Sequence, residues 1–378
     1  MKMEKVKVKL SGNAHRYEIK IGHNLLDECG LWAKNCLPEK ARNIAVVSNP
    51  KVFRLYGGAV EKSLKNVGFE VAVWLMTDGE RYKNFRSLET ALAFFSENKL
   101  KRTDAVVALG GGVVGDLAGF SASVYLRGVA FLQIPTTLLA MIDSSVGGKT
   151  AVNTSFGKNL VGAFHQPRGV LIDAAVLRTL PRRELTAGFC EAVKQGAIAD
   201  RNFFAQTADF LRSHSPNRFK KLFAETTAAN KNFLEDLEKL IAAQVAFKAR
   251  IVAQDERENV ERLDAKSRKI LNFGHTVGHA LERATDYKYF KHGEAVGYGM
   301  LAAAEISKEV ANFVQDELKS FNDVVRLTGN LPAADNIPVD EVVKAISFDK
   351  KSIGESLHWI LLEKIGRPVI VSSESVSK

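Results

Sequence analysis

The sequence is poor in three features that would place it in a special class of protein. It has only three cysteines, Cys29, Cys36 and Cys190, and their wide scatter argues against a disulfide framework and for a reducing compartment. No run of about 18 apolar residues occurs, so a membrane span is not expected. The opening segment MKMEKVKVKL lacks the apolar core of a signal peptide. We therefore expect a cytoplasmic protein with no membrane partner.

Aromatic residues and long basic blocks are also scarce. Aromatics make up 8% of the 378 residues, and the Lys and Arg residues are spread along the chain although the formal net charge is +10. The charge alone favours a nucleic-acid or acidic-membrane partner. Because the cations are dispersed, we interpret them as a solvated basic surface and expect no nucleic-acid partner. A small anionic substrate would need only a few of them.

The pattern of apolar residues along the chain changes near residue 180. Before it, Val- and Ile-rich runs alternate with helical stretches, which is typical of βαβ units and a mostly parallel sheet. Buried strands are predicted at 43–49, 70–76, 104–112, 129–137 and 169–176, with paired strands at VKVKL and YEIKIG near the start. The stretch 219–254 has no Pro or Gly and repeats apolar residues at intervals of three and four. The predicted fold is α/β plus all-α, with an α/β domain at 1–179 and a helical domain at 180–378.

A glycine cluster follows the predicted strand at 104–112. Gly110, Gly112 and Gly115 have the G-x-G-x-x-G spacing that lets backbone N–H groups approach a pyrophosphate at a helix start. The motif comes after several strands, and no acidic residue stands about 20 positions further on to bind a ribose. Plain tight turns also contain such clusters. A bound nucleotide is therefore expected, but its contacts with the protein should differ from those of the usual dinucleotide-binding motif.

The stretch DSSVGGKTAVN ends like a phosphate-binding loop without being one. Such a loop needs glycine where Asp143 stands, so an NTPase is excluded. What remains is a group of Asp143, Lys149, Lys158 and Asn159 on glycine-rich backbone. The lysines offer point charges to phosphate or carboxylate. A charged surface loop is the alternative.

Histidines gather in two neighbouring segments. His275 and His279, in LNFGHTVGHALE, are four residues apart and should share one helix face, and His292 follows in KYFKHGEAVGYGM. Glu191 and Lys194 lie three apart in GFCEAVKQGAI, where an ion pair is the alternative to a ligand. One Glu and two His with an open position form a catalytic zinc site. Spacing alone does not decide which three of Glu191 and the three histidines would be the ligands.

Taken together, the motifs resemble those of the 3-dehydroquinate synthases, within the sugar-phosphate cyclases. The matching pieces run in the family's order from about residue 78 to 351: DGERYK, GGGVVGDLAGF, YLRGVAFLQIPTTLLAMIDSSVGGKTAVN, GKNLVGAFHQP, TLPRREL, EAVKQG, LNFGHTVGHALE, HGEAVGYGM and DKK. The resemblance implies an N-terminal NAD-binding domain, a helical metal- and substrate-binding domain, NAD and a divalent metal (zinc or cobalt) as cofactors, and a homodimer.

The resemblance also assigns residues to roles. The metal ligands would be Glu191, His275 and His292, which leaves His279 for the substrate phosphate. Cofactor contacts would be Asp78, Gly79, Glu80, Arg81, Tyr82, Lys83, Gly112, Val113, Val114, Gly115, Asp116, Thr136, Thr137, Lys149, Lys158, Val176, Leu177, Arg178, Thr179 and Leu180. Substrate contacts would be Asp143, Lys149, Asn159, Lys194, Lys248, Arg268 and Asn272. Arg127 would reach the phosphate across the dimer interface, and Lys350 or Lys351 would join it.

The implied reaction converts 3-deoxy-D-arabino-heptulosonate 7-phosphate, a phosphorylated keto-sugar acid, to 3-dehydroquinate and phosphate, with NAD reduced and reoxidised in each turnover. One departure from the family is that 255–275 is a few residues longer, which weakens the assignment of Lys248. Three alternatives stay open: a sister cyclase acting on sedoheptulose 7-phosphate or an amino-sugar analogue, a metal-dependent polyol dehydrogenase that releases NADH, and a nucleic-acid-binding protein with strongly salt-dependent affinity.

Overall fold

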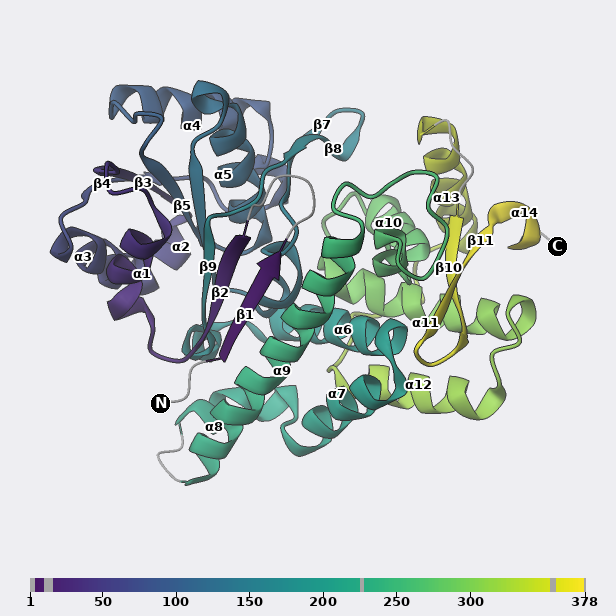
Figure 1. Ribbon diagram of the computed structural model, residues 1–378. Coiled ribbons are helices and arrows are strands. Elements are labelled where there is room, and N and C mark those ends of the chain that lie inside the picture. The colour runs from purple at the N-terminus through teal and green to yellow at the C-terminus, as the bar shows by residue number, and fades with distance from the viewer. Residues whose placement is uncertain (1–3, 10–15, 225–227, 354–357, 377–378) are drawn as a thin grey trace. The chain divides into compact units, whose positions relative to one another are not determined.

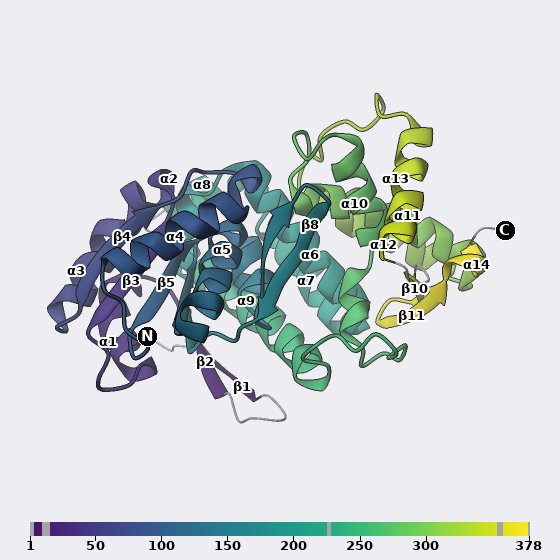
Figure 2. The same ribbon diagram turned by 90° about the horizontal axis from the view of Figure 1, so that it is seen from above.

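The computed structural model describes residues 4–9, 16–224, 228–353 and 358–376 (Figures 1 and 2). The chain divides into two compact units, Met1–Arg178 with Leu237–Ala253, and Thr179–Asp236 with Gln254–Lys378. The predicted domain boundary after residue 179 stays a prediction. The structure adds that Leu237–Ala253, part of the predicted helical stretch, belongs to the first unit.

The first unit is built on a seven-stranded sheet with the order β1-β2-β9-β6-β5-β3-β4. All neighbours are parallel except β1 and β2, which pair antiparallel. The strands are β1 (Glu4–Lys9), β2 (Arg16–Gly22), β3 (Asn43–Ser48), β4 (Glu70–Leu75), β5 (Ala105–Gly110), β6 (Ala130–Pro135) and β9 (Gly169–Asp173). Each overlaps a predicted strand, and β5 and β9 are buried along their whole length, as parallel strands covered on both faces should be.

Helices cover both faces of this sheet (Figure 1). Helices α4 and α5 bury Phe95 and Leu117 against Val47 and Val106, which point to the same face of β3 and β5. Helices α1 and α3 cover the other face. The helices of this unit are α1 (Cys29–Cys36), α2 (Pro50–Val52), α3 (Gly58–Asn66), α4 (Phe85–Glu97) and α5 (Gly112–Val124), with the later part of α9 (Ala228–Gln254).

A hairpin forms within the stretch for which the sequence predicted a polar group on glycine-rich backbone, with a charged surface loop as the alternative. Strands β7 (Lys149–Thr154) and β8 (Gly157–Phe164) pair antiparallel from Lys149 with Phe164 to Thr154 with Gly157. The strands were not predicted because glycines and lysines hide the alternation of apolar residues. The hairpin places Lys149 and Lys158 on a defined backbone.

The second unit is mainly helical, as predicted, with one additional hairpin. The α/β plus all-α fold class is confirmed. Among the described residues no helix is both long and apolar enough to cross a lipid bilayer. The elements are α6 (Arg182–Ala199), α7 (Arg201–Ser213), α8 (Phe219–Ala224), the start of α9, α10 (His275–Ala284), α11 (His292–Val310), α12 (Gln315–Leu327), α13 (Val339–Ile353), β10 (His358–Lys364), β11 (Arg367–Ser372) and α14 (Ser373–Val376).

Asp104 ties the start of β3 to the start of β5. Its buried carboxylate accepts hydrogen bonds from the backbone N–H groups of Arg42 (3.0 Å), Asn43 (3.0 Å) and Lys101 (2.8 Å), and from the Asn43 side chain (2.8 Å). Burial by itself raises the pKa of Asp104, but these hydrogen bonds outweigh it and lower the pKa.

We expect Asp104→Ala to destabilise the protein by about 2–4 kcal/mol at pH 7, because buried N–H groups lose their acceptor. Since the folded-state pKa lies below the unfolded one, this contribution is complete above about pH 4 and is lost as the pH falls through the folded pKa. Urea unfolding of both proteins at pH 7 and pH 3 measures it. If wild type and Asp104→Ala differed in free energy of unfolding by the same amount at pH 7 and pH 3, the account would be contradicted.

Candidate functional site

The start of α10 places His275 and His279 on one helical face. The residue before the helix, Gly274, has a left-handed φ of 79°, and a Cβ there would lie 2.7 Å from the backbone nitrogen of Met300 on α11. Glycine therefore satisfies both the conformation and the close contact. The consequence is that α10 begins at His275 directly against α11.

The start of α11 holds His292 in place. The carboxylate of Glu294, fully buried, accepts a hydrogen bond from the backbone N–H of Lys291 at 2.8 Å. The same carboxylate pairs in bidentate fashion with Arg183 of α6, with N–O distances of 2.8 and 2.6 Å. An acidic group at a helix N-terminus is stabilised by the helix dipole. The first turn of α11 is thereby fixed to α6.

Three imidazoles meet at these two helix starts. One ring nitrogen from each of His275, His279 and His292 lies within 4.8 Å of the others, a spacing that fits a metal ion. Ring centroids are 5.2 Å apart for His275 with either neighbour and 5.6 Å for His279 with His292. His279 is the exposed member of the three. The sequence motif has become a compact group of nitrogen donors.

Glu191 of α6 faces this group from the protein interior. Its Oε1 lies 3.9 Å from His275 Nε2 and 3.7 Å from His292 Nε2, and the side chain is fully buried. Lys194 Nζ lies 2.5 Å from Oε2, yet neither carboxylate oxygen has a hydrogen bond of acceptable geometry among the described residues. Lys194 pairs with Oε2, while Oε1 faces the two imidazoles without a hydrogen bond among the described residues, which is the arrangement of an oxygen ligand to a metal. The donor set therefore fits a divalent metal.

Burial makes His275 a ready ligand. It lowers the pKa of His275 well below the ordinary histidine value, and the nearby charge of Lys194 lowers the pKa further. The ring is therefore neutral, which is the form that binds metals. Its Nδ1 lies 3.3 Å from the Phe273 carbonyl oxygen, which directs Nε2 toward Glu191.

The ligand assignment itself stays a prediction. The structure brings Glu191, His275 and His292 together as expected, but it also brings His279 within the same group. Geometry without an ion does not separate a metal ligand from a phosphate contact.

Arg268 and Asn272 lie in the short helix Arg268–Asn272 just before α10. Arg268 is buried, its backbone N–H binds Asp255 at 2.8 Å, and its Nη1 donates to the Glu256 carbonyl at 2.9 Å. Asn272 donates to Glu258 at 3.4 Å. The segment from Asp255 to Glu258 thus contacts both Arg268 and Asn272, and Glu258 is a neighbour that the sequence did not indicate.

The predicted cofactor contacts of the first unit follow the carboxyl ends of its parallel strands. Such ends meet at one edge of a sheet, where ligands bind in this class of fold. The groups are Asp78–Lys83 after β4, Gly112–Asp116 at the start of α5 after β5, Thr136 and Thr137 after β6, and Val176, Leu177 and Arg178 after β9; Thr179 and Leu180 belong to the second unit.

Two observations fit a nucleotide at this edge. Helix α5, 13 residues long, begins at Gly112 without a side-chain hydrogen bond at its N-cap, and the first N–H groups of a helix are suited to a phosphate. The hydroxyl of Thr136 is buried and has no hydrogen-bond partner among the described residues. Asp78 accepts a hydrogen bond from Asn49, which follows β3, at 3.2 Å.

Lys83 organises the polar groups beside α5. Its buried Nζ lies 2.8 Å from Asp116, 2.7 Å from the Asn159 side-chain oxygen and 3.0 Å from Glu80. Burial alone would lower the pKa of Lys83, but Asp116 and Glu80 outweigh it and raise the pKa, so the ammonium group stays charged. Asn159 has a left-handed φ of 57°, which directs it from the β7–β8 hairpin toward this lysine.

Asp143 and Lys248 are brought together within the first unit. The Lys248 ammonium donates to the Asp143 carbonyl oxygen at 2.6 Å and also contacts its carboxylate. Sequence reasoning gave both residues to the substrate without pairing them. Lys149 and Arg127 are exposed, and Arg127 has a φ of 64°. Lys350 lies in α13, but its side chain and that of Lys351 are outside the described residues.

Comparison with known proteins decides the family. The model described as 3-dehydroquinate synthase N-terminal matches residues 73–187, and the corresponding C-terminal model matches residues 188–352. The chain belongs to the 3-dehydroquinate synthase family. It is 40% identical over 353 residues to the 3-dehydroquinate synthase of Nostoc punctiforme, covering 93% of this chain and 91% of that protein. The enzyme of Bordetella pertussis is also 40% identical, with 97% and 94% covered.

Solved structures of several other enzymes share this fold. A 2-deoxy-scyllo-inosose synthase, complexed with carbaglucose-6-phosphate, NAD⁺ and Co²⁺, superposes with a TM-score of 0.80 at 24% identity, covering 99% and 98% of the two chains. The 2-epi-5-epi-valiolone synthase of Streptomyces hygroscopicus, with NAD⁺ and Zn²⁺ bound, gives 0.79 at 26% identity, covering 96% and 94%. A glycerol dehydrogenase of Schizosaccharomyces pombe gives 0.62 at 16% identity, covering 86% and 80%.

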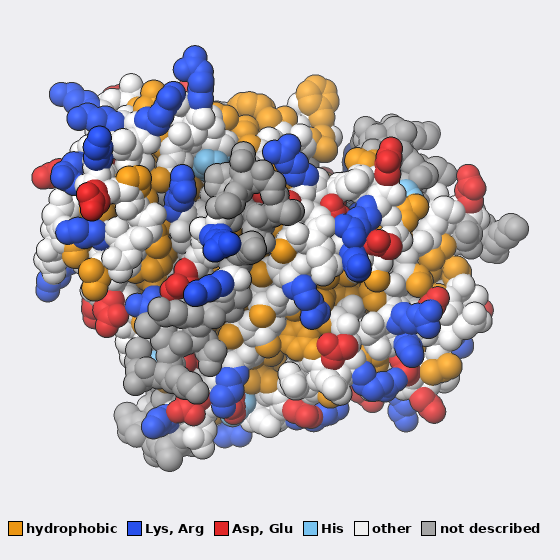
Figure 3. Space-filling view, in the orientation of Figure 1, with side chains coloured by type: hydrophobic (Ala, Val, Ile, Leu, Met, Phe, Trp, Pro, Cys, Tyr) orange, Lys and Arg blue, Asp and Glu red, His pale blue; other side chains and the backbone are white. Residues whose placement is uncertain are grey.

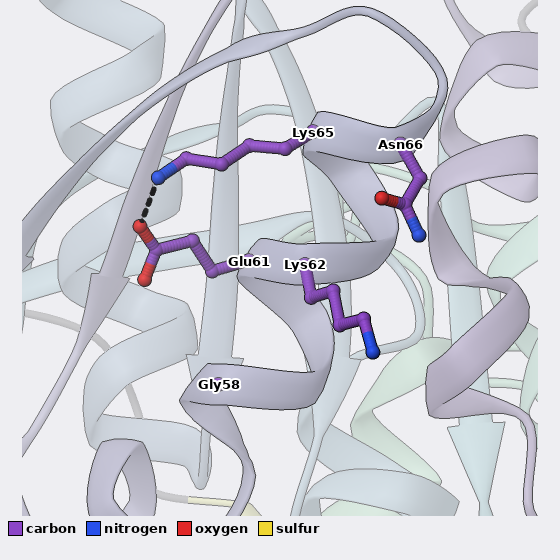
Figure 4. Close-up of a pocket in the computed structure, with 5 residues that line it drawn as sticks. All are labelled: Gly58, Glu61, Lys62, Lys65 and Asn66. Atoms are coloured by element: carbon purple, nitrogen blue, oxygen red, sulfur yellow. Dashed lines mark hydrogen bonds and ion pairs between the residues drawn. The ribbon is translucent and has the colours of Figure 1, made fainter.

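A shallow pocket on the first unit does not include any of the predicted site residues. It lies along one face of α3 and is lined by Gly58, Glu61, Lys62, Lys65 and Asn66 (Figure 4). Lys65 and Glu61 pair across one helical turn at 2.6 Å, an arrangement typical of a solvated helix face.

Proposed function

We propose that this chain is a 3-dehydroquinate synthase. It converts 3-deoxy-D-arabino-heptulosonate 7-phosphate to 3-dehydroquinate and phosphate, a carbon–oxygen lyase reaction of the shikimate pathway. The observation that carries the proposal is Glu191: in a chain of this family, its buried carboxylate pairs with Lys194 through Oε2, while Oε1 has no hydrogen bond among the described residues and faces two imidazoles. A cation site of this composition suits the binding of neighbouring sugar hydroxyls.

Glu191, His275 and His292 would hold the divalent cation, and the residues at the sheet edge would hold NAD. When bound, NAD takes a hydride from the substrate alcohol and later returns it, while the cation acidifies that alcohol. The Lys83 ammonium group holds Asp116 and Asn159 in position at this edge of the sheet by donating a hydrogen bond to each. These residues mainly orient the reactants.

The anionic groups of the substrate require cations and amide donors near the metal. Arg268 and Asn272 end next to α10, and Lys194 lies beside Glu191, so they are the natural contacts for carboxylate and hydroxyl groups. His279, the exposed imidazole, would bind the phosphate. The remaining proposed contacts of the substrate or the cofactor are Asp143, Lys149, Lys158, Asn159 and Lys248.

The proposal includes a cytoplasmic homodimer. Arg127 is exposed on a strained turn, with left-handed φ angles at Leu126 and Arg127, and would reach the phosphate of the other subunit. Lys350 or Lys351 would add a second cation. No nucleic-acid partner is proposed, because on the face shown in Figure 3 the Lys and Arg side chains are interspersed with Asp and Glu.

The test is a reaction of the purified protein with the heptulosonate phosphate, catalytic NAD⁺ and zinc or cobalt. We expect stoichiometric phosphate release without accumulation of NADH. Sedoheptulose 7-phosphate and glycerol serve as control substrates for the sister cyclases and polyol dehydrogenases. Turnover of sedoheptulose 7-phosphate alone, or NADH production from glycerol, would overturn the proposal.

A further inference from the structure

A second carboxylate contacts the histidine cluster, at the ring nitrogen of His292 that does not face Glu191. Glu282 lies on α10, seven residues after His275, so it falls two helical turns along the same face. Its side chain is 3% exposed, and Oε2 lies 3.0 Å from His292 Nδ1. The other ring nitrogen of His292, Nε2, is the atom that lies 3.7 Å from Glu191.

We infer that Glu282 is a positioning residue for His292, an inference that rests on the proposed metal site. A carboxylate accepts hydrogen bonds and donates none, so Nδ1 of His292 carries the proton and donates it to Glu282. The lone pair of the neutral ring is then on Nε2, directed toward Glu191 and the cation position. A carboxylate partner of this kind also fixes the orientation of the ring relative to the metal position.

The position of Glu282 is itself fixed by the end of α10. Its carbonyl oxygen accepts hydrogen bonds from the backbone N–H of Tyr287 at 2.7 Å and from the Thr285 hydroxyl at 3.2 Å. These bonds hold the backbone from which the carboxylate extends. His292 is fixed independently, since Glu294 caps the first turn of α11. The hydrogen bond therefore joins two supported elements, as a positioning contact requires.

The two histidines that face Glu191 are oriented by different groups. Nδ1 of His275 lies 3.3 Å from a neutral backbone carbonyl, whereas Nδ1 of His292 has a charged carboxylate at 3.0 Å. His292 is also the more exposed of the two, with 35% of its side chain accessible against 13%. The more exposed ring, His292, thus has the stronger hydrogen-bond partner, Glu282. Removing the Glu282 carboxylate should therefore affect metal binding more than folding.

The test uses Glu282→Gln, which keeps the shape and one acceptor oxygen but removes the charge. We expect zinc affinity, measured by chelator competition on the full-length protein, to fall roughly 10- to 100-fold. The melting temperature of the metal-free protein should stay close to that of the wild type. The control is Glu305→Gln, which removes an exposed carboxylate from α11 and should leave zinc affinity unchanged.

Nitrogen NMR of the metal-free protein provides a readout that a merely structural role would not change. The wild type should show His292 protonated on Nδ1, and Glu282→Ala should show a mixture of tautomers. Unchanged zinc affinity in Glu282→Gln, or the same tautomer in Glu282→Ala, would overturn the inference while leaving the proposed function standing. A wild-type protein that neither binds zinc nor releases phosphate would overturn both.

Discussion

Replacing His275 with alanine is expected to abolish metal retention and turnover together. His275 supplies the most buried imidazole of the cluster, and its Nε2 lies 3.9 Å from Oε1 of the buried Glu191 carboxylate. Loss of a direct ligand should weaken zinc binding by more than about 100-fold, beyond the range typical of outer partners. Metal content after dialysis and phosphate release measure the two effects.

His279→Ala is the matched variant, four residues along the same helix. We expect it to retain zinc and to lose on the order of 10- to 100-fold in kcat/KM, as for removal of a hydrogen bond of about 1.5–3 kcal/mol to a charged group. The loss should be smaller for a substrate analogue without phosphate. If both variants lose metal to the same extent, the proposed division of roles between His275 and His279 is wrong.

Gly293→Ala is expected to disrupt the site through the backbone. A Cβ at Gly293 would lie 2.0 Å from the carbonyl oxygen of Ala187 on α6, so α11 must move away from α6. Overpacking commonly costs about 1–3 kcal/mol. Because His292 precedes this glycine and Glu191 is on α6, the displacement should also separate two of the proposed metal ligands. Urea unfolding and zinc affinity should both report the change.

Gly58→Ala is the control for the glycine substitution. Apart from its chain neighbours and the backbone of its own helix, no atom of the described residues lies within 4 Å of a Cβ at this position on α3, so alanine should be neutral or stabilise by about 0.5–1 kcal/mol. Zinc affinity should not change. If Gly293→Ala were as stable as Gly58→Ala and bound zinc normally, the close contact between α6 and α11 would not position the site.

The parallel sheet could be predicted from the sequence because its buried strands are continuous apolar runs. β5, for example, is Val- and Ala-rich and buried at every position. The β7–β8 hairpin could not be predicted, since Gly157 and Gly162 interrupt its pattern and Asn159 has a left-handed φ. The hairpin β10–β11 was hidden for another reason: it is a local pair within a helical unit.

Part of the site was also accessible from sequence. The four-residue spacing of His275 and His279 fixes a shared helix face, and that face exists. Glu191 precedes His275 by 84 residues in the sequence, so only the tertiary fold brings it to the histidine cluster. Glu282 and Glu294 act between helices, and no spacing rule predicts such contacts. The family resemblance supplied the ligand assignment that spacing left open.

Anomalous diffraction from crystals of the zinc-loaded protein tests the central claim most directly. We predict one strong peak at the zinc edge, about 2.0–2.2 Å from a Glu191 oxygen and from Nε2 of His275 and His292. His279 should lie outside this shell. A peak coordinated by His279 in place of Glu191, or no peak near α10 and α11, would contradict the account.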